Sequence, residues 1–279
     1  MTDPRRMPVN ARVAAADWPD IPEGVRPVKG MARQVALPVV DLLRTPGGPR
    51  DRQLLLGEQV TVLETHQGWS FVRAEKDGYV GYLFDTALAK PAETTHVVSV
   101  RASHLHSAAD FKSQEGFALS FGSRIRALSV TDKWVETSDG FVPRVHLRES
   151  GHRFEDPLVV ASLFRGTPYL WGGNSTFGVD CSGLVQAALL ACGIPCPGDS
   201  DMQAEEVGEA LPAGMPFQRG DLLFWKGHVA LVENPDVLLH ANAHHMAVAR
   251  EPLPQAIERI AAQGDGPVTA HRRVEKELK

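Results

Sequence analysis

The stretch DCSGLVQAALLACGIP, residues 180–195, decides the fold of the C-terminal half of this chain. An apolar segment runs from Ser182 to Cys192, and it is followed at once by Gly193 and Pro195. An apolar run of this length that stops at glycine and proline is typical of a helix and its C-terminal end. The pattern therefore predicts a helix over 182–192, with Cys181 at its N-terminus.

The position of Cys181 favours a catalytic role for its thiol. Only the thiolate is a good nucleophile, and the unpaired N–H groups and positive dipole end of a helix N-terminus lower a thiol pKa. The same N–H groups can hold a developing oxyanion. A loop containing Gly172, Gly173 and Gly178 leads into the helix. A lone cysteine is more often a buried structural residue, but behind this glycine loop we interpret Cys181 as the nucleophile.

Two histidines downstream offer a base for this thiol. His228 begins the apolar run 228–232, and His240 ends the run 237–240 after the turn Glu233-Asn234-Pro235-Asp236. A hairpin centred on Asn234 sets His228 directly opposite His240, on the same face. One imidazole would take the thiol proton while the other fixes its tautomer and orientation. The alternative is a pair of half-buried structural histidines, and a one-residue slip would separate the two rings.

The rest of the C-terminal half has one more early helix and a set of strands. We expect the helix over 156–164, since Pro157 suits a first helical turn. Expected strands span 221–225, 228–232, 237–242 and 246–249, and a short helix spans 255–262. Helices followed by an antiparallel sheet predict an α+β domain.

The N-terminal half is predicted to be rich in strands and to contain an internal repeat. Turn signals separate short alternating runs between residues 33 and 90, which suggests a small barrel. The pattern recurs over 95–148: a Trp follows twelve positions after Gly57 and after Gly122 in both copies. Such a repeat indicates two copies of one small module. It resembles bacterial SH3-like barrels, although generic tandem β-modules fit as well.

Composition narrows the class of protein. The chain has 279 residues, a net charge of −5 and a pI near 6.1, which argues against a nucleic-acid binder. No signal-peptide pattern and no membrane-spanning stretch are present in the sequence, so we expect no membrane partner and a cytoplasmic location. Three cysteines are too few for a disulfide scaffold, and free thiols fit a reducing compartment. We expect a monomer without cofactor or metal.

Five short blocks of the C-terminal half together resemble the NlpC-type cysteine peptidases, which are papain-like hydrolases of cell-wall peptides. In chain order they are TPYLWGG (167–173), DCSGLVQ (180–186), GDLLFW (220–225), HVA (228–230) and LHA (239–241). The resemblance implies that Cys181 is the nucleophile, His228 the general base and His240 the group that orients it. It also implies that Tyr169 lies near the oxyanion site.

The arrangement of the whole chain resembles the γ-D-glutamyl-L-diamino acid endopeptidases, which recycle peptidoglycan stem peptides. The five prolines within residues 1–32 predict an irregular segment, and the resemblance implies SH3-like barrels over 33–90 and 91–149 and a peptidase domain over 150–279. It also implies cleavage of the γ-D-Glu–diamino acid bond in muropeptides with a free N-terminal L-Ala. The implied substrate-binding residues are Asp180, which would pair with the substrate ammonium, then Ser182, Ser200, Tyr79 and either Asp51 or Glu58. Gly198 stands where members often carry Arg.

Other interpretations of the same residues remain open. The chain could be a non-catalytic binding module, or an acyltransferase that shares the acyl-enzyme. His240, His244 and His245 with Asp221 could suggest a metal site, but their spacing matches no zinc pattern. Asp221 follows a glycine at a strand start, where we favour a turn or backbone-bonding role.

Overall fold

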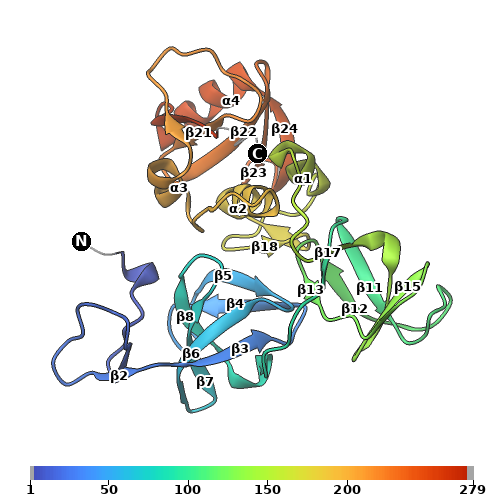
Figure 1. Ribbon diagram of the computed structural model, residues 1–279. Coiled ribbons are helices and arrows are strands. Elements are labelled where there is room, and N and C mark those ends of the chain that lie inside the picture. The colour runs from blue at the N-terminus through green and yellow to red at the C-terminus, as the bar shows by residue number, and fades with distance from the viewer. Residues whose placement is uncertain (1–2, 275–279) are drawn as a thin grey trace. The chain divides into compact units, whose positions relative to one another are not determined.

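The computed structural model describes residues 3–274, which divide into two compact units. The first unit ends at Gly151 and the second begins at His152. The first consists almost entirely of strands, whereas the four α-helices found among the described residues all belong to the second (Figure 1). Within residues 3–274, no helix is both long and apolar enough to cross a membrane.

The first unit begins with a segment for which the sequence predicts little regular structure. The segment instead carries a 3-10 turn, η1 (Pro4–Arg6), and two short parallel strands, β1 (Val13–Ala15) and β2 (Arg26–Val28). Val13 and Ala15 are buried against Leu63 and Phe71. This contact orders the segment, because burying apolar side chains offsets the entropy lost by fixing the chain.

A seven-stranded sheet follows, in the order β5-β4-β8-β7-β6-β3-β9. Its strands are β3 (Met31–Val35), β4 (Val39–Leu43), β5 (Arg50–Leu55), β6 (Gln59–His66), β7 (Trp69–Ala74), β8 (Val80–Phe84) and β9 (Leu88–Ala89), with the 3-10 turn η2 (Asp85–Ala87) before β9. Among the described residues no pairing joins the edge strands β5 and β9, so the sheet is not closed by backbone bonds.

The remaining strands of the first unit form two further sheets. One has the order β13-β10-β17 and the other the order β12-β11-β16-β15-β14. The strands are β10 (His96–Val98), β11 (Ala102–His106), β12 (Glu115–Ser120), β13 (Arg124–Ile125), β14 (Ser129–Val130), β15 (Trp134–Thr137), β16 (Gly140–Pro143) and β17 (Leu147–Glu149), with η3 (Arg144–His146) before β17. Both sheets share one core, in which Val98, Leu119, Val135 and Val142 are fully buried.

The repeat predicted from the sequence occupies matching backbone positions. Gly57 and Gly122 both adopt positive φ angles, 80° and 87°, which disfavour residues with a Cβ. The tryptophans twelve positions later, Trp69 and Trp134, each begin a strand, β7 and β15. The two halves of the first unit therefore place equivalent residues at equivalent turns and strand starts.

The second unit packs helices against an antiparallel sheet of order β20-β25-β21-β22-β23-β24. The helices are α1 (Pro157–Leu163), α2 (Cys181–Ala191), α3 (Ser200–Glu206) and α4 (Leu253–Ile260), which continues into η4 (Ala261–Asp265). The sheet strands are β20 (Glu209–Ala210), β21 (Leu222–Trp225), β22 (His228–Asn234), β23 (Val237–Asn242), β24 (Ala247–Pro252) and β25 (Ala270–Arg273); β18 (Asn174–Ser175) pairs with β19 (Gly178–Val179) in a separate ribbon. The predicted elements are present, whereas α3, β20 and β25 were not expected.

Asp221 fastens the last strand to the sheet. Its side chain is 1% exposed and accepts hydrogen bonds from the Gln218 backbone N–H (2.8 Å) and from Arg273 Nε (2.8 Å). His271 Nε2 lies 2.6 Å from the same carboxylate. Burial alone would raise the pKa of Asp221, but the hydrogen bonds from Arg273 and His271 outweigh it and hold this pKa below its ordinary value. The expected backbone-bonding role is confirmed, with an added role in docking β25.

We expect Asp221→Asn to destabilise the second unit by about 2–4 kcal/mol, because it leaves a buried hydrogen-bonded cluster without its negative charge. Chemical denaturation measures the change. The control is Asp236→Asn in the exposed turn between β22 and β23, where the change should stay within about 0.5 kcal/mol. Equal effects of the two substitutions would contradict the role given to Asp221.

Candidate active site

Cys181 is the first residue of α2, one position earlier than the predicted helix start. Asp180 caps the helix, since its Oδ1 accepts the Gly183 N–H (2.6 Å) and its Oδ2 accepts the Gly172 N–H (2.9 Å). A Cβ at Gly183 would collide with the carbonyl oxygen of Gly173, so glycine lets the preceding loop run against the first turn. The capping carboxylate thus fixes both the loop and the helix start around the thiol.

The thiol lies beside the strand that carries His228. Cys181 is 5% exposed, and its Sγ lies 4.0 Å from the carbonyl oxygen of Gly227, the residue immediately before His228. Helix α2 packs on β22 and β23, the two strands of the predicted hairpin. Packing a helix start onto these strands brings together a cysteine and histidines that are about 50 residues apart in sequence.

The register of this hairpin differs from the prediction by two residues. Leu231 pairs with Leu239, whereas the predicted register pairs Leu231 with Val237. An irregularity at Glu233 and a tight turn at Pro235-Asp236 account for the shift. A shift of two residues keeps each side chain on its face. The prediction that His228 lies directly opposite His240 is therefore wrong, but the two side chains still share a face.

The two imidazoles form part of a line of hydrogen-bonded groups across three strands and a helix. His228 Nε2 lies 2.9 Å from His240 Nδ1, and His240 Nε2 lies 3.1 Å from Glu251 Oε2. Arg259, on α4, donates to both oxygens of Glu251, each at 2.7 Å. His240 and Glu251 are buried, at 1% and 7% exposure. The line ends at His228, next to Cys181.

The protonation state of each ring in this line follows from Glu251, the carboxylate that accepts hydrogen bonds at one end. Burial alone would raise the pKa of Glu251, but hydrogen bonds from Arg259 and His240 hold it well below its ordinary value, so the group is a carboxylate. His240 must then donate through Nε2. Burial lowers the pKa of His240, so the ring is neutral and its Nδ1 accepts from His228 Nε2. Burial, reinforced by His240, lowers the pKa of His228 to about 3, which leaves its Nδ1 as an unprotonated acceptor.

Comparison with known proteins agrees with this geometry. A model of the NlpC/P60 family matches residues 166–259, and a model of the bacterial dipeptidyl-peptidase Sh3 domain matches residues 42–88. A gamma-D-glutamyl-L-lysine dipeptidyl-peptidase of Bacillus subtilis is 30% identical over 215 residues, which cover 68% of this chain and 71% of the relative. The chain belongs to the NlpC/P60 family. It is a cysteine peptidase with a papain-like fold, and an SH3-like, strand-rich region precedes this fold in the sequence.

Two further comparisons extend over most of the chain. A protein of the same printed name from Bacillus cereus is 24% identical over 278 residues, covering 87% of this chain and 83% of the relative. The crystal structure of an NlpC/P60 family protein from Bacillus cereus superposes with a TM-score of 0.72 at 20% identity, covering 87% of this chain and 99% of that one. At that identity the superposition shows that the two proteins share a fold.

Tyr169 lies close to the thiol of this NlpC/P60 chain. Burial raises the pKa of Tyr169 above its ordinary value, with smaller electrostatic contributions from Cys181 and Asp180. Its backbone N–H donates to the Met246 carbonyl (2.9 Å), and the residue bridges to Val179. Its role at the oxyanion site stays a prediction.

The predicted substrate residues of the peptidase unit also have structural contacts. Ser182 is buried, and its Oγ donates to Asp180 Oδ1 (3.2 Å). Ser200 is the half-buried first residue of α3. Gln203, also on α3, donates to the carbonyls of Ser182 (3.0 Å) and Pro197 (2.9 Å), which ties α3 to the first turn of α2. The substrate contacts of these residues stay predictions.

The predicted substrate residues outside the peptidase unit all belong to the first unit. Tyr79 is 1% exposed, and the Arg6 guanidinium lies over its ring at 5.9 Å. Asp51 forms an ion pair with Arg44 at 2.6 Å, while Glu58 pairs with Lys76 at 2.9 Å. Both acidic candidates thus have a cationic partner inside the first unit. Their place in an amine pocket stays a prediction.

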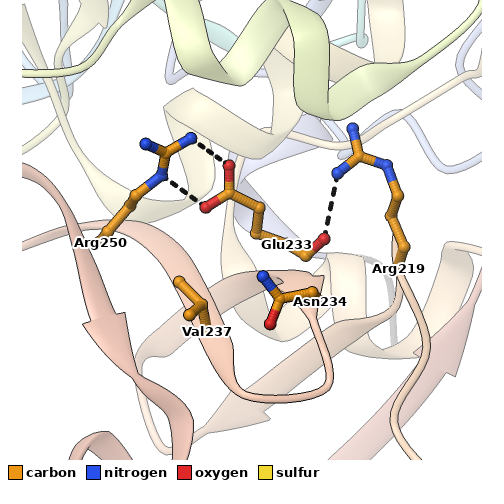
Figure 2. Close-up of a pocket in the computed structure, with 5 residues that line it drawn as sticks. All are labelled: Arg219, Glu233, Asn234, Val237 and Arg250. Carbon is orange, nitrogen blue, oxygen red and sulfur yellow. Dashed lines mark hydrogen bonds and ion pairs between the residues drawn. The ribbon is translucent and has the colours of Figure 1, made fainter.

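A surface pocket lies at the other end of β22 from His228, and Figure 2 shows the residues that line it. Arg250 forms an ion pair with Glu233, and Arg219 donates to the Glu233 carbonyl (3.0 Å) (Figure 2). Arg219 also donates to Asp156 (2.8 Å). Both arginines are thus bound to carboxylates of the chain. The pocket lies at the hairpin turn, and its lining includes none of the candidate active-site residues.

The metal alternative does not match the arrangement of its residues. Among residues 3–274, no group of three or more His, Cys, Asp or Glu is arranged to hold a metal ion. His240 is bonded to His228 and Glu251, while Asp221 is bonded to His271.

Glu251 and Arg259 are the parts of the site that the sequence interpretation missed. The predicted strand ended at residue 249, whereas β24 continues to Pro252. Ala249 lies opposite His240 in the β23–β24 pairing, so Glu251, two residues later, shares its face. Extending the strand by this alternation would have found the carboxylate.

The low pKa of His228 has a consequence for stability. At pH 5 the folded chain keeps His228 neutral, while its unfolded imidazole, with a pKa of 6.5, is protonated. The unfolded state binds the extra proton, so the free energy of unfolding falls as the pH drops below 6.5. The free energy of unfolding of the wild-type chain should fall between pH 7 and pH 5. We expect His228→Gln to make this fall smaller by about 2 kcal/mol.

Hydrogen exchange of the β22 and β23 amides at the two pH values measures this difference locally. The control is the same substitution at His244, which is exposed and lies outside the hydrogen-bonded line, so it gives the baseline for a histidine-to-glutamine change. An identical pH dependence in wild type and His228→Gln would show that His228 titrates normally in the folded chain.

Proposed function

We propose that this chain is a γ-D-glutamyl-L-diamino acid endopeptidase that cleaves peptidoglycan stem peptides with a free N-terminal L-Ala. The observation that carries the proposal is Cys181 at the start of α2, beside a neutral His228 whose other ring nitrogen is held by His240. The names of the two Bacillus relatives, both γ-D-glutamyl-L-lysine dipeptidyl-peptidases, support the bond and the substrate class.

In the proposed acylation step, His228 Nδ1 takes the thiol proton of Cys181, and the sulfur attacks the γ-carbonyl carbon of D-Glu. The carbonyl π electrons move to oxygen, where the backbone amides at the start of α2 and the Tyr169 phenol are the proposed donors. The intermediate collapses with cleavage of the C–N bond. The amine of the diamino acid leaves with the proton from His228, and L-Ala-γ-D-Glu stays on sulfur as a thioester.

In the deacylation step, a water molecule gives a proton to His228 as its oxygen attacks the thioester carbon. The C–S bond breaks, and the thiolate of Cys181 regains the proton. His240 accepts a hydrogen bond from His228 throughout, so it stabilises the imidazolium that forms in each step. No cofactor enters either step.

The proposed specificity for a free amine rests on Asp180. Its carboxylate accepts hydrogen bonds from Gly183, Gly172 and Ser182 in the structure. A substrate ammonium would pair with this carboxylate by a charge-assisted hydrogen bond. Ser182 and Ser200 would hold the peptide.

The proposal includes the finer organisation of the chain. Residues 33–90 and 91–149 would be two SH3-like barrels, which the shared glycine turns and tryptophan strand starts support. The enzyme would act as a cytoplasmic monomer in the recycling of wall-derived peptides. The three cysteines form no disulfide in the structure, which fits a reducing compartment.

We expect Cys181→Ala to abolish cleavage of L-Ala-γ-D-Glu-L-lysine and of the diaminopimelate analogue, because no thioester can form. Mass spectrometry of the products measures the cleavage. Cys192→Ala, outside the site, is the matched control and should keep wild-type activity. Turnover by Cys181→Ala, with circular dichroism showing an intact fold, would contradict the role given to Cys181.

We also expect acetylation of the substrate's N-terminal amine to reduce kcat/KM by at least about 100-fold, because the neutral amide cannot pair with the Asp180 carboxylate. Parallel assays of the free and acetylated tripeptides measure the ratio. Equal rates for the two peptides would remove Asp180 from amine recognition.

A further inference from the structure

Glu251 is a buried carboxylate that contacts neither Cys181 nor His228. It is hydrogen-bonded to the imidazole of His240, which is in turn hydrogen-bonded to His228. It is 7% exposed, lies on β24, and joins Arg259 of α4 to His240 of β23. Placing a charge in such a position is costly unless it is paired and hydrogen-bonded. The structure meets this requirement with one bidentate guanidinium and one imidazole N–H.

We propose that Glu251, anchored by Arg259, is a positioning residue that selects the tautomer of His240 and thereby leaves His228 Nδ1 unprotonated for the thiol proton. This inference rests on the proposed function of the same site, and it adds two residues to it. Glu251 acts through His240 and does not touch the reacting atoms.

Glu251 can select the tautomer because its carboxylate fixes, one after another, which nitrogen of each ring donates a hydrogen bond and which accepts one. A carboxylate can only accept, so His240 Nε2 carries the proton and His240 Nδ1 does not. His240 Nδ1 must then accept from His228 Nε2. Without the acceptor at position 251, His240 could instead donate from Nδ1. His228 would then carry its proton on Nδ1, where it cannot receive one from Cys181.

Arg259 fixes which atoms Glu251 can present. It donates to both carboxylate oxygens, Nε to Oε1 and Nη2 to Oε2. A glutamine at 251 would turn its carbonyl oxygen to the guanidinium and leave its amide N–H groups facing His240 Nε2. Glu251→Gln therefore reverses the direction of the two hydrogen bonds that join residue 251 to His240 and His240 to His228, although it changes no heavy-atom volume.

The two members of the ion pair act on His228 with opposite sign. The negative charge of Glu251 favours the imidazolium form of His228, while the positive charge of Arg259 opposes it. The other charged or titratable groups that act on these residues are His245, beside His240, and Asp265, near Arg259. Removing Arg259 should shift the titration of His228 upward, and removing Glu251 should shift it downward.

The experiment compares Glu251→Gln with Arg259→Gln, since both break the same ion pair but only the first removes the carboxylate. Glu258→Gln, at an exposed position of α4, is the matched control. The assays are kcat and KM on the free tripeptide, the rate of Cys181 alkylation by iodoacetamide against pH, and ¹⁵N NMR of the histidine rings. The last assay reports each tautomer directly.

We expect Glu251→Gln to lower kcat by about 100-fold with little change in KM, because it places the proton of His228 on the wrong nitrogen. Arg259→Gln should lower kcat by less than Glu251→Gln does, because the carboxylate acceptor remains, and should shift the acid limb of the alkylation profile to higher pH. Equal losses in both variants would show that the ion pair is merely structural and would overturn the proposal.

The NMR measurement on the wild-type chain tests the same claim without any substitution. We expect the Nε2–H tautomer for both His228 and His240 at pH 7. An Nδ1–H tautomer at either ring would overturn the positioning role, whether or not the variants fold. If the wild type fails to cleave the tripeptide, the proposed substrate is wrong, while alkylation and NMR still decide the role of Glu251.

Discussion

The hydrogen bond between His228 and His240 is the interaction on which the rest of the site depends. It exists because strands β22 and β23 present both rings on one face, and its direction is set by a carboxylate one strand further along. Burial keeps both imidazoles neutral, so each has one donor and one acceptor nitrogen. Because both rings are neutral, the tautomer that Glu251 sets in His240 also sets the tautomer of His228, and so leaves His228 Nδ1 unprotonated for the proton of Cys181. Two charged rings would instead repel each other.

Hydrogen bonds accepted by a buried carboxylate also explain the position of the nucleophile. Asp180 ends a loop and begins a helix, and its carboxylate binds the amides on both sides of Cys181. The thiol therefore has a fixed position, and α2 is pressed onto the strands that carry the histidines. Asp180 thus fixes both the loop and the helix start. In the proposed reaction the same carboxylate would also bind the substrate amine.

Sequence patterns predicted the parts of the site that local rules control. The apolar run after Cys181 placed the helix start within one residue, and alternation along the hairpin put the histidines on one face. The register was wrong by two residues because the irregularity at Glu233 depends on strand pairing, which no local pattern specifies. Glu251 was missed because a charged pair of residues, Arg250-Glu251, looks like the end of a strand, and only the partner Arg259 on α4 makes its burial favourable.

The central claim is that the γ-D-glutamyl acyl group passes through a thioester on Cys181. Acid quenching during turnover of L-Ala-γ-D-Glu-L-lysine, followed by intact-mass and peptide mapping, tests it most directly. The account predicts a mass increase equal to the L-Ala-γ-D-Glu acyl group, located on the peptide that contains Cys181 and removed by hydroxylamine. Turnover with an unmodified Cys181, or the acyl group on another residue, would contradict it.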